Sequence, residues 1–171
     1  MNVMKKIKID KLTLNIGAGK DATMLKKAVK LLKHITNVDP VQTITQKRLA
    51  AWGLRPGLPI GAKITLRDEA VVNELVKRLF AARDNKLKPE CFDNYGNISF
   101  GIHEYVDIPG VKYETELGIL GLQVSITLSR PGFRVKRRKI KKTSIGKKHL
   151  ITQEEAISFA KENFGIALEE D

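Results

Sequence analysis

Ten cationic residues lie close together between residues 129 and 149, in the stretch SRPGFRVKRRKIKKTSIGKKH. No Asp or Glu occurs between Leu117 and Gln153 to neutralise them. Guanidinium and ammonium groups at this density bind phosphates, and their mutual repulsion opposes independent folding. We therefore expect a phosphate-binding arm that becomes ordered on its partner; a solvated tail or a localisation signal is the alternative. Its cations are Arg130, Arg134, Lys136, Arg137, Arg138, Lys139, Lys141, Lys142, Lys147 and Lys148.

The net charge of the chain comes almost entirely from this arm. The 171 residues include 31 basic and 19 acidic side chains, for a net charge of +12. Without the ten cations of the arm, 21 basic and 19 acidic residues remain, a net charge of +2. An acidic polymer is the partner that such a balance favours, nucleic acid well ahead of an anionic membrane. No apolar run approaches the length that spans a bilayer, so we expect no membrane partner.

A second pattern, Gly17-Ala18-Gly19-Lys20-Asp21-Ala22, fits the GxGxxA spacing of dinucleotide-binding turns. The acid that would bind the ribose, Asp39, precedes the next strand candidate, whereas ribose recognition needs it at the strand's end. As a phosphate-binding loop the pattern lacks a glycine at Leu14, and Asp21 replaces Ser or Thr. We interpret the two glycines as a sharp turn from strand to helix. A nucleotide-dependent enzyme remains a distant third hypothesis.

Other catalytic or metal-binding chemistry has little support. His34, His103 and His149 are scattered without the spacing of metal ligands. The single cysteine, Cys91, excludes an internal disulfide and is interpreted as a small buried thiol in a cytosolic protein. We expect no enzymatic activity, no cofactor and no metal site.

Alternating apolar residues predict strands over 11–16, 62–67, 97–102 and 122–128, and a weaker one over 41–46. Capping residues place helices after Asp21 or Thr23, after Asp68, and from Thr152 to about residue 164. Between these elements, Gly and Pro make 47–61 a long exposed loop. This predicts one α+β domain over 1–171: an antiparallel sheet with helices packed on one face and an open, polar, RNA-facing side. The expected helix stripes are Leu25, Val29, Leu32 and Ile35; Val71, Val72, Leu75, Leu79 and Phe80; and Ile157, Ala160 and Phe164.

The strand residues expected on the open side contain no acid. A face that meets only water would mix both signs of charge, whereas amides, hydroxyls and cations suit phosphates, ribose hydroxyls and base edges. We therefore predict RNA contact here, with a plain solvated face as the alternative. The positions are Lys11, Thr13, Asn15, Lys63, Thr65, Arg67, Asn97, Ser99, Gly101, Gln123, Ser125 and Thr127, with either Gln42 and Gln46 or Thr43 and Thr45 from the weak strand.

Three long motifs carry a family resemblance. KLTLNIGAGKD, TQKRLAAWGLRPGLPIGAKITLR and FDNYGNISFGIHEYVDIPGVKYE resemble, in order and spacing, the large-subunit ribosomal protein family five, which binds 5S rRNA. The tail LSRPGFRVKRRKIKKTSIGKKHLITQEEAISFAKENFG looks like the archaeal form, whose eukaryotic counterpart is numbered eleven. The bacterial pattern differs, because it lacks the basic insert and extends further at its N-terminus. The family's GQKP loop is Asn37-Val38-Asp39-Pro40 here, with Gln42 as the candidate substitute for its Gln.

The resemblance implies a structural constituent of the large ribosomal subunit in the cytoplasm. It implies binding to 5S and 23S rRNA in the central protuberance, beside neighbouring large-subunit proteins, and contact with P-site tRNA and a small-subunit head protein. Lys11, Asn15 and Thr65 match RNA-contact positions of the family, and Gln42, Thr45, Lys47 and Arg48 join the candidates. The tRNA-facing residues would be Trp52, Gly53, Leu54, Arg55 and Pro56, unless Trp52 folds onto the core. A free regulatory RNA-binding module is the alternative function.

Overall fold

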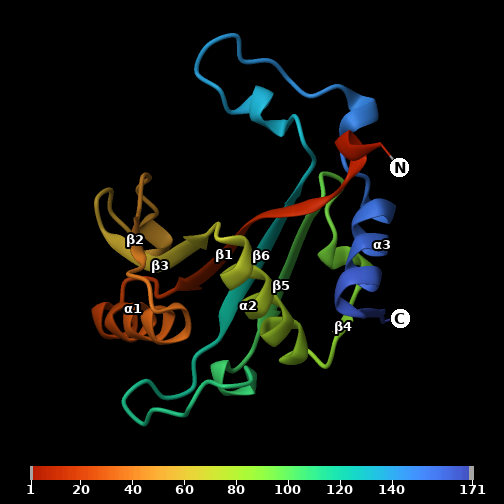
Figure 1. Ribbon diagram of the computed structural model, residues 1–171. Helices are drawn as coiled ribbons and strands as arrows, with labels where there is room; N and C mark the ends of the chain where they lie inside the picture. The colour runs from red at the N-terminus through yellow and green to blue at the C-terminus, as the bar shows by residue number, and fades with distance from the viewer. Residues whose placement is uncertain (1, 170–171) are drawn as a thin grey trace. The chain divides into compact units, whose positions relative to one another are not determined.

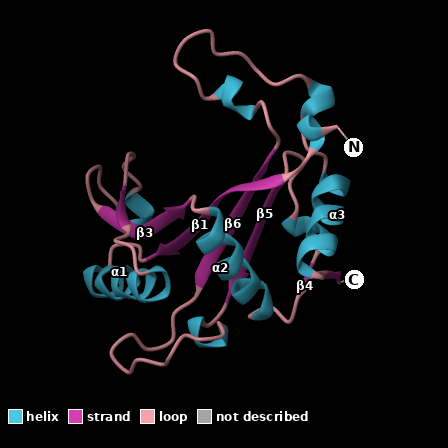
Figure 2. Cartoon of the chain, in the orientation of Figure 1, coloured by secondary structure: helices cyan, strands magenta, loops and turns pink. Residues whose placement is uncertain are grey.

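The computed structural model describes residues 2–169, and its strands and helices form an α+β fold, as predicted (Figure 2). A mostly antiparallel sheet has the strand order β2-β3-β1-β6-β5, and β4 and β7 form a separate parallel pair. The helices are α1 (Ala22–Thr36), α2 (Glu69–Ala81) and α3 (Gln153–Phe164). The strands are β1 (Lys8–Gly17), β2 (Val41–Ile44), β3 (Pro59–Leu66), β4 (Lys86–Leu87), β5 (Asn97–Ile102), β6 (Leu122–Ser129) and β7 (Ala167–Leu168).

The chain divides into two compact units, which we describe separately. Unit 1 comprises Met1–Leu12, Arg67–Phe100 and Ser125–Asp171, and unit 2 comprises Thr13–Leu66 and Gly101–Val124. The division falls within β1, β5 and β6, so a single domain over 1–171 stays a prediction.

The long strands bury every second side chain, as their alternation predicts. Leu12 and Leu14 of β1 are fully buried and Ile16 nearly so. On β6, Leu122, Val124, Ile126 and Leu128 follow the same rule, and Gln123 is exposed while Ser125 and Thr127 are half-buried. Because successive side chains of a strand point to opposite faces, the polar positions of each strand share the face away from the core.

In unit 2, α1 covers the apolar side of β3 (Figure 1). The helix begins after Asp21, whose carboxylate accepts the N–H of Thr23 at 2.8 Å, so this N-cap is confirmed. Its buried stripe runs through Leu25, Ala28, Leu31, Leu32 and Ile35. The predicted stripe included Val29, which is only half-buried, because Ala28 and Leu31 face the core in its place.

In unit 1, α2 begins after its predicted cap, Asp68, and packs on β5 through the stacked rings of Phe80 and Phe100, 5.3 Å apart. Val71 was expected in the apolar stripe, but its side chain is 43% exposed and Val76 is buried instead. Adjacent helical residues point about 100° apart, so a stripe that contains Val72 turns Val71 toward solvent.

The capping box at the start of α3 is confirmed. Thr152 accepts the N–H of Glu155, and the Glu155 carboxylate accepts the N–H of Thr152. Ala156 and Ala160 are the buried residues of this helix, while Ile157 and Phe164 are half-buried. Gly165 ends it with a φ of 64°.

Candidate nucleic-acid interface

The polar face of unit 2 lies on β1, β3 and β6. The hydroxyls of Thr13 and Thr65 are 3.5 Å apart across β1 and β3, and Asn15 donates from Nδ2 to Oε1 of Gln123 at 3.1 Å. Lys63 adds an exposed cation on the same side of β3 as Thr65. These hydroxyls, amides and the ammonium group can bind phosphate oxygens, ribose hydroxyls and base edges.

The register of the edge strand β2 corrects two predicted members of this face. Thr43 pairs with Gly61 and Gln42 with Ala62, so Thr43 shares the outward side of Lys63, whereas Gln42 shares the side of buried Ala62. Thr45 is only 7% exposed, and its hydroxyl donates to the carbonyl of Leu58 at 3.0 Å. Gln42 therefore lies off the outward polar side of β2, and Thr45 is buried beside it.

The polar face of unit 1 lies on β5 and β6. The hydroxyls of Ser99 and Ser125 are 3.2 Å apart, and Asn97 donates to the carboxylate of Asp93 at 3.0 Å. The strand positions themselves contain no acid, but the turn before β5 brings Asp93 to Asn97, which alternation alone does not reveal. Among the other candidates of this unit, Lys11 is half-exposed and Arg67 is exposed.

The connection from β2 to β3, in unit 2, is an extended hairpin rather than a featureless loop. Leu49 and Leu54 exchange two backbone hydrogen bonds of 3.0 Å, around a turn that ends at Gly53 with a φ of 64°. Leu54 is 6% exposed and belongs to the core, whereas Trp52 is 69% exposed. The indole of Trp52 therefore stands outside the core. The other candidates of this connection, Lys47, Arg48, Arg55 and Pro56, are also exposed.

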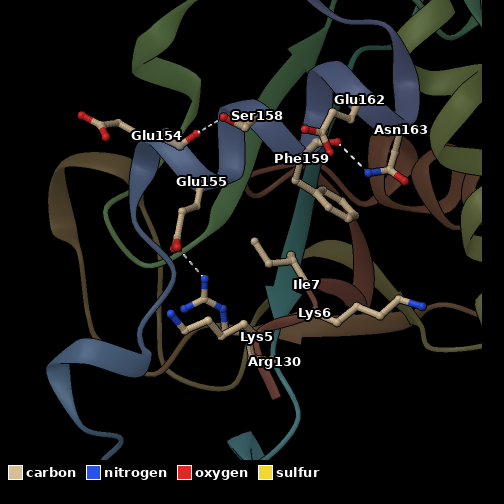
Figure 3. Close-up of a pocket in the computed structure, with 10 residues that line it drawn as sticks. All are labelled: Lys5, Lys6, Ile7, Arg130, Glu154, Glu155, Ser158, Phe159, Glu162 and Asn163. Carbon is tan, nitrogen blue, oxygen red and sulfur yellow. Dashed lines mark hydrogen bonds and ion pairs between the residues drawn. The ribbon is translucent and has the colours of Figure 1, made fainter. Parts of the chain in front are cut away.

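Arg130, predicted to bind RNA, is buried instead. Its side chain is 5% exposed and donates to the carboxylate of Glu155 at 2.6 Å (Figure 3). It also donates to the carbonyl of Leu150 at 3.1 Å. Burial by itself raises the pKa of Glu155, but the N–H of Thr152 and the guanidinium of Arg130 outweigh it and lower that pKa. Arg130 thus joins the two ends of the arm to the start of α3, and the correction removes it from the RNA-binding candidates.

The other nine cations of the arm are exposed, on a loop with two short helical turns that extends between β6 and α3 in unit 1 (Figures 1 and 2). Buried Phe133 holds its first turn, and Arg137 binds both carboxylate oxygens of Asp10, at 2.9 and 3.0 Å. Arg138 donates to the carbonyl of Lys141 at 2.7 Å and closes the outer turn. These intramolecular contacts differ from our expectation of an arm that is ordered only by its partner.

The glycine pattern after β1 does not offer a phosphate site. The carboxylate of Asp21 already occupies the N-terminus of α1, and the hydroxyl and N–H of Thr23 lower its pKa. A negative charge fixed there repels a phosphate from the position where a nucleotide loop would bind it. Gly19 has a φ of 60°, in agreement with a sharp turn.

Acidic side chains gather on α3, in unit 1. Glu154, Glu155 and Glu162 line a groove of about 530 Å³ together with Lys5 and Lys6 (Figure 3). Lys5, Lys6 and the buried Arg130 balance the three carboxylates, so the groove has no net positive charge to attract phosphate.

Three remaining features bear on other classes of function. Cys91, predicted to be buried, is partly exposed at the end of the short helical turn Pro89–Cys91. Within residues 2–169, no three His, Cys, Asp or Glu side chains gather into a possible metal site. No helix in that part of the chain is both long and apolar enough to cross a bilayer.

Comparison with known proteins gives consistent matches along the chain. The family model for ribosomal protein L5 matches residues 2–55, and the model for the C-terminal part of the same ribosomal family matches residues 59–159. A large ribosomal subunit protein uL5 of Sulfolobus acidocaldarius is 49% identical over 167 residues, 98% of this chain and 93% of the relative. Those of Nanoarchaeum equitans (96% of this chain, 97% of the relative) and Sulfurisphaera tokodaii (99% and 96%) are 47% and 46% identical.

Proposed function

The chain belongs to the ribosomal protein L5 family, and on this basis we propose that it binds 5S rRNA and 23S rRNA in the central protuberance. As a member of this family it is a structural constituent of the large ribosomal subunit and not an enzyme. The resemblance seen in the sequence is thereby confirmed. Its place is the ribosome, among rRNA and other ribosomal proteins.

The observation that supports 5S binding most is the composition of the polar strand faces. The outward positions of β1 and β3 in unit 2 carry no acid: apart from half-exposed Pro59, those that are exposed or half-exposed carry a hydroxyl, an amide, an ammonium group or a glycine. The pairs Thr13–Thr65 and Asn15–Gln123 hold their polar atoms in place, so little side-chain entropy is lost when RNA binds. A surface of this kind can follow a sugar–phosphate backbone and also reach base edges.

The arm, in our proposal, binds 23S rRNA rather than 5S rRNA. Its exposed cations lie on an extended loop, which can follow phosphates into a crevice that a folded domain cannot enter. The bacterial pattern of the family lacks this insert although those relatives bind 5S rRNA. On this proposal, 5S binding rests on the strand faces and does not need the arm.

The hairpin between β2 and β3 is the part that we assign to P-site tRNA. Trp52 and Arg55 are both exposed on it, an indole that can stack on a base or ribose and a cation that can pair with phosphate. Neighbouring large-subunit proteins and a small-subunit head protein complete the proposed partners. A free regulatory RNA-binding module, the alternative, would not co-sediment with large subunits in high salt.

Replacement of Asn15 or Thr65 by Ala tests the strand face. Each variant should bind isolated 5S rRNA about 5- to 150-fold more weakly, because a buried RNA group loses its hydrogen-bond partner. Melting temperatures should stay close to that of the wild type, since both residues face away from the core. Asn94→Ala and Thr115→Ala, at exposed positions outside the strands, are matched controls. Wild-type affinity in both test variants would place the 5S site elsewhere.

A triple substitution of Lys139, Lys141 and Lys142 by Gln tests the arm without a deletion. These lysines are exposed, so the fold should persist. If each neutralises one phosphate, the slope of log K against log salt for subunits stripped of the protein should fall by about 2–3. Binding to isolated 5S rRNA should change much less.

The matched control for the arm is a triple Lys to Gln substitution at Lys26, Lys77 and Lys161, which removes the same charge from the three helices. Loss of 5S affinity in the arm variant, with binding to stripped subunits unaltered, would reject the assignment of the arm to 23S rRNA.

Arg55→Glu tests the hairpin. A reversed charge on the proposed tRNA side should repel phosphate and weaken P-site tRNA binding in ribosomes that contain the variant, as measured by filter binding. Isolated 5S rRNA should still bind with wild-type affinity. Arg55→Lys keeps the charge and is the control. A loss of 5S binding in Arg55→Glu would instead assign the hairpin to 5S rRNA.

A further inference from the structure

A shallow hollow of about 370 Å³ lies in unit 2, on the polar side of the neighbouring strands β1, β6 and β5. One glycine at or beside each of these strands borders it: Gly17 at the end of β1, Gly101 in β5 and Gly121 just before β6. Asn15, Gln123 and His103 supply its polar side chains, and no acid lines it. Its volume is within the range of about 300–1,000 Å³ typical of ligand sites.

The three glycines are there for different reasons. A Cβ at Gly121 would lie 2.9 Å from the carbonyl oxygen of His103, so the packing of the backbone requires this glycine. A Cβ at Gly17 or Gly101 would meet nothing within 4 Å, and neither residue has the left-handed backbone that favours glycine. Glycine weakens a strand interior, and its presence often marks a close approach by a ligand or another backbone. The space around Gly101 is open, so the backbone there is accessible to a ligand that approaches this face.

The side of the hollow presents an ordered donor and acceptor. The hydrogen bond from Asn15 Nδ2 to Gln123 Oε1 fixes both amides. It leaves the Asn15 oxygen as an acceptor and the Gln123 amino group as a donor for a ligand. An adjacent donor and acceptor match the edge of a nucleobase, and the exposed ring of His103 can stack on one.

We propose that this hollow takes one unpaired nucleobase of the bound 5S rRNA, splayed out of its strand. The face of the base lies on the peptide groups at Gly17 and Gly101, where no side chain intervenes, and its edge binds Asn15 and Gln123. A phosphate is a poorer occupant because no cation lines the hollow. The inference rests on the proposed 5S binding and adds that one base is read there.

Gly101→Val tests this proposal, because a Cβ at this position meets no other atom within 4 Å and the side chain fills the hollow. Isolated 5S rRNA is probed with reagents that modify the Watson–Crick edges of unpaired bases, and in parallel with hydroxyl radicals that cleave the backbone. The wild type should protect one unpaired base from modification. Gly101→Val should restore the reactivity of that base and weaken 5S rRNA binding by about tenfold or more. The protection of the RNA backbone at other positions should remain unchanged. Gly101→Ala should give a smaller effect of the same kind.

Two controls separate the possible outcomes. Ala81→Val adds apolar bulk at an exposed position of α2 and should change neither the reactivities nor the affinity. Thermal melting should show Gly101→Val to be folded, and Gly17→Ala offers a second, smaller filling from β1.

If Gly101→Val and Gly17→Ala protect every base as the wild type does, while Thr65→Ala still weakens 5S binding, the base site is wrong and the proposed function stands. Normal 5S protection by both glycine variants with impaired incorporation into subunits would mean that a protein side chain occupies the hollow, which also overturns the proposal. A wild-type protein that protects no part of 5S rRNA would refute the proposed function itself.

Discussion

The period of two along the strands is the constraint on which both the fold and the proposed interface depend. Leu12 and Leu14 are fully buried because the residues between them, beginning with Thr13, point to the opposite face. A slip of one residue in the pairing of β1 would carry its polar side chains into the core and its leucines into solvent. The free energy of burial therefore fixes the polar face with the same strength as the apolar one. Burial thus decides which way the proposed RNA-binding side chains point, and hydrogen bonds such as that between Asn15 and Gln123 then orient their polar atoms.

Within each unit the acidic side chains lie mainly away from the polar strand faces, which favours binding of RNA phosphates there. In unit 2, Glu114 and Glu116 lie beside α1, where Lys30 contacts both carboxylates, at 3.3 and 2.5 Å. The hydrogen bond to Glu116 is the largest cause that raises the pKa of Lys30, and the hydrogen bond to Glu114 is the second largest. In unit 1, the acids gather on α3, and Glu155 is bound to Arg130. The outward strand positions of unit 2 carry no carboxylate, so a phosphate that approaches them meets donors and the ammonium group of Lys63 rather than repulsion.

Much of this could be predicted from the sequence because the signals are local. Strict alternation located β5 to the residue, and the side chains of Asp21, Asp68 and Thr152 act as caps as predicted. The corrections concern long-range partners. In the sequence, Arg130 is indistinguishable from the other cations of the basic run. Only the fold shows that α3 places Glu155 beside it. The outward side of β2 is decided only by its register with β3, which the four residues of an edge strand do not specify.

The hollow bordered by Gly17, Gly101 and Gly121 also depends on long-range contacts that the sequence does not reveal. Each of Gly17, Gly101 and Gly121 has an ordinary explanation when it is met alone, as a turn or an outward strand position. Only the strand order brings them to one place, and only the space around each missing Cβ distinguishes the glycine that packing requires from those that it does not. Neither the strand order nor this space can be predicted from the residues along the chain.

The central claim is that the polar faces of the strands, and not the helices, bind 5S rRNA. Ultraviolet cross-linking of the complex, followed by mass spectrometry of the cross-linked peptides, maps the contacts most directly. The account predicts cross-links in peptides from β1, β3 and β6, at outward positions such as Lys11 and Lys63, and none on the exposed sides of α1 and α2. Cross-links confined to those helices, with the strands unmodified, would contradict it.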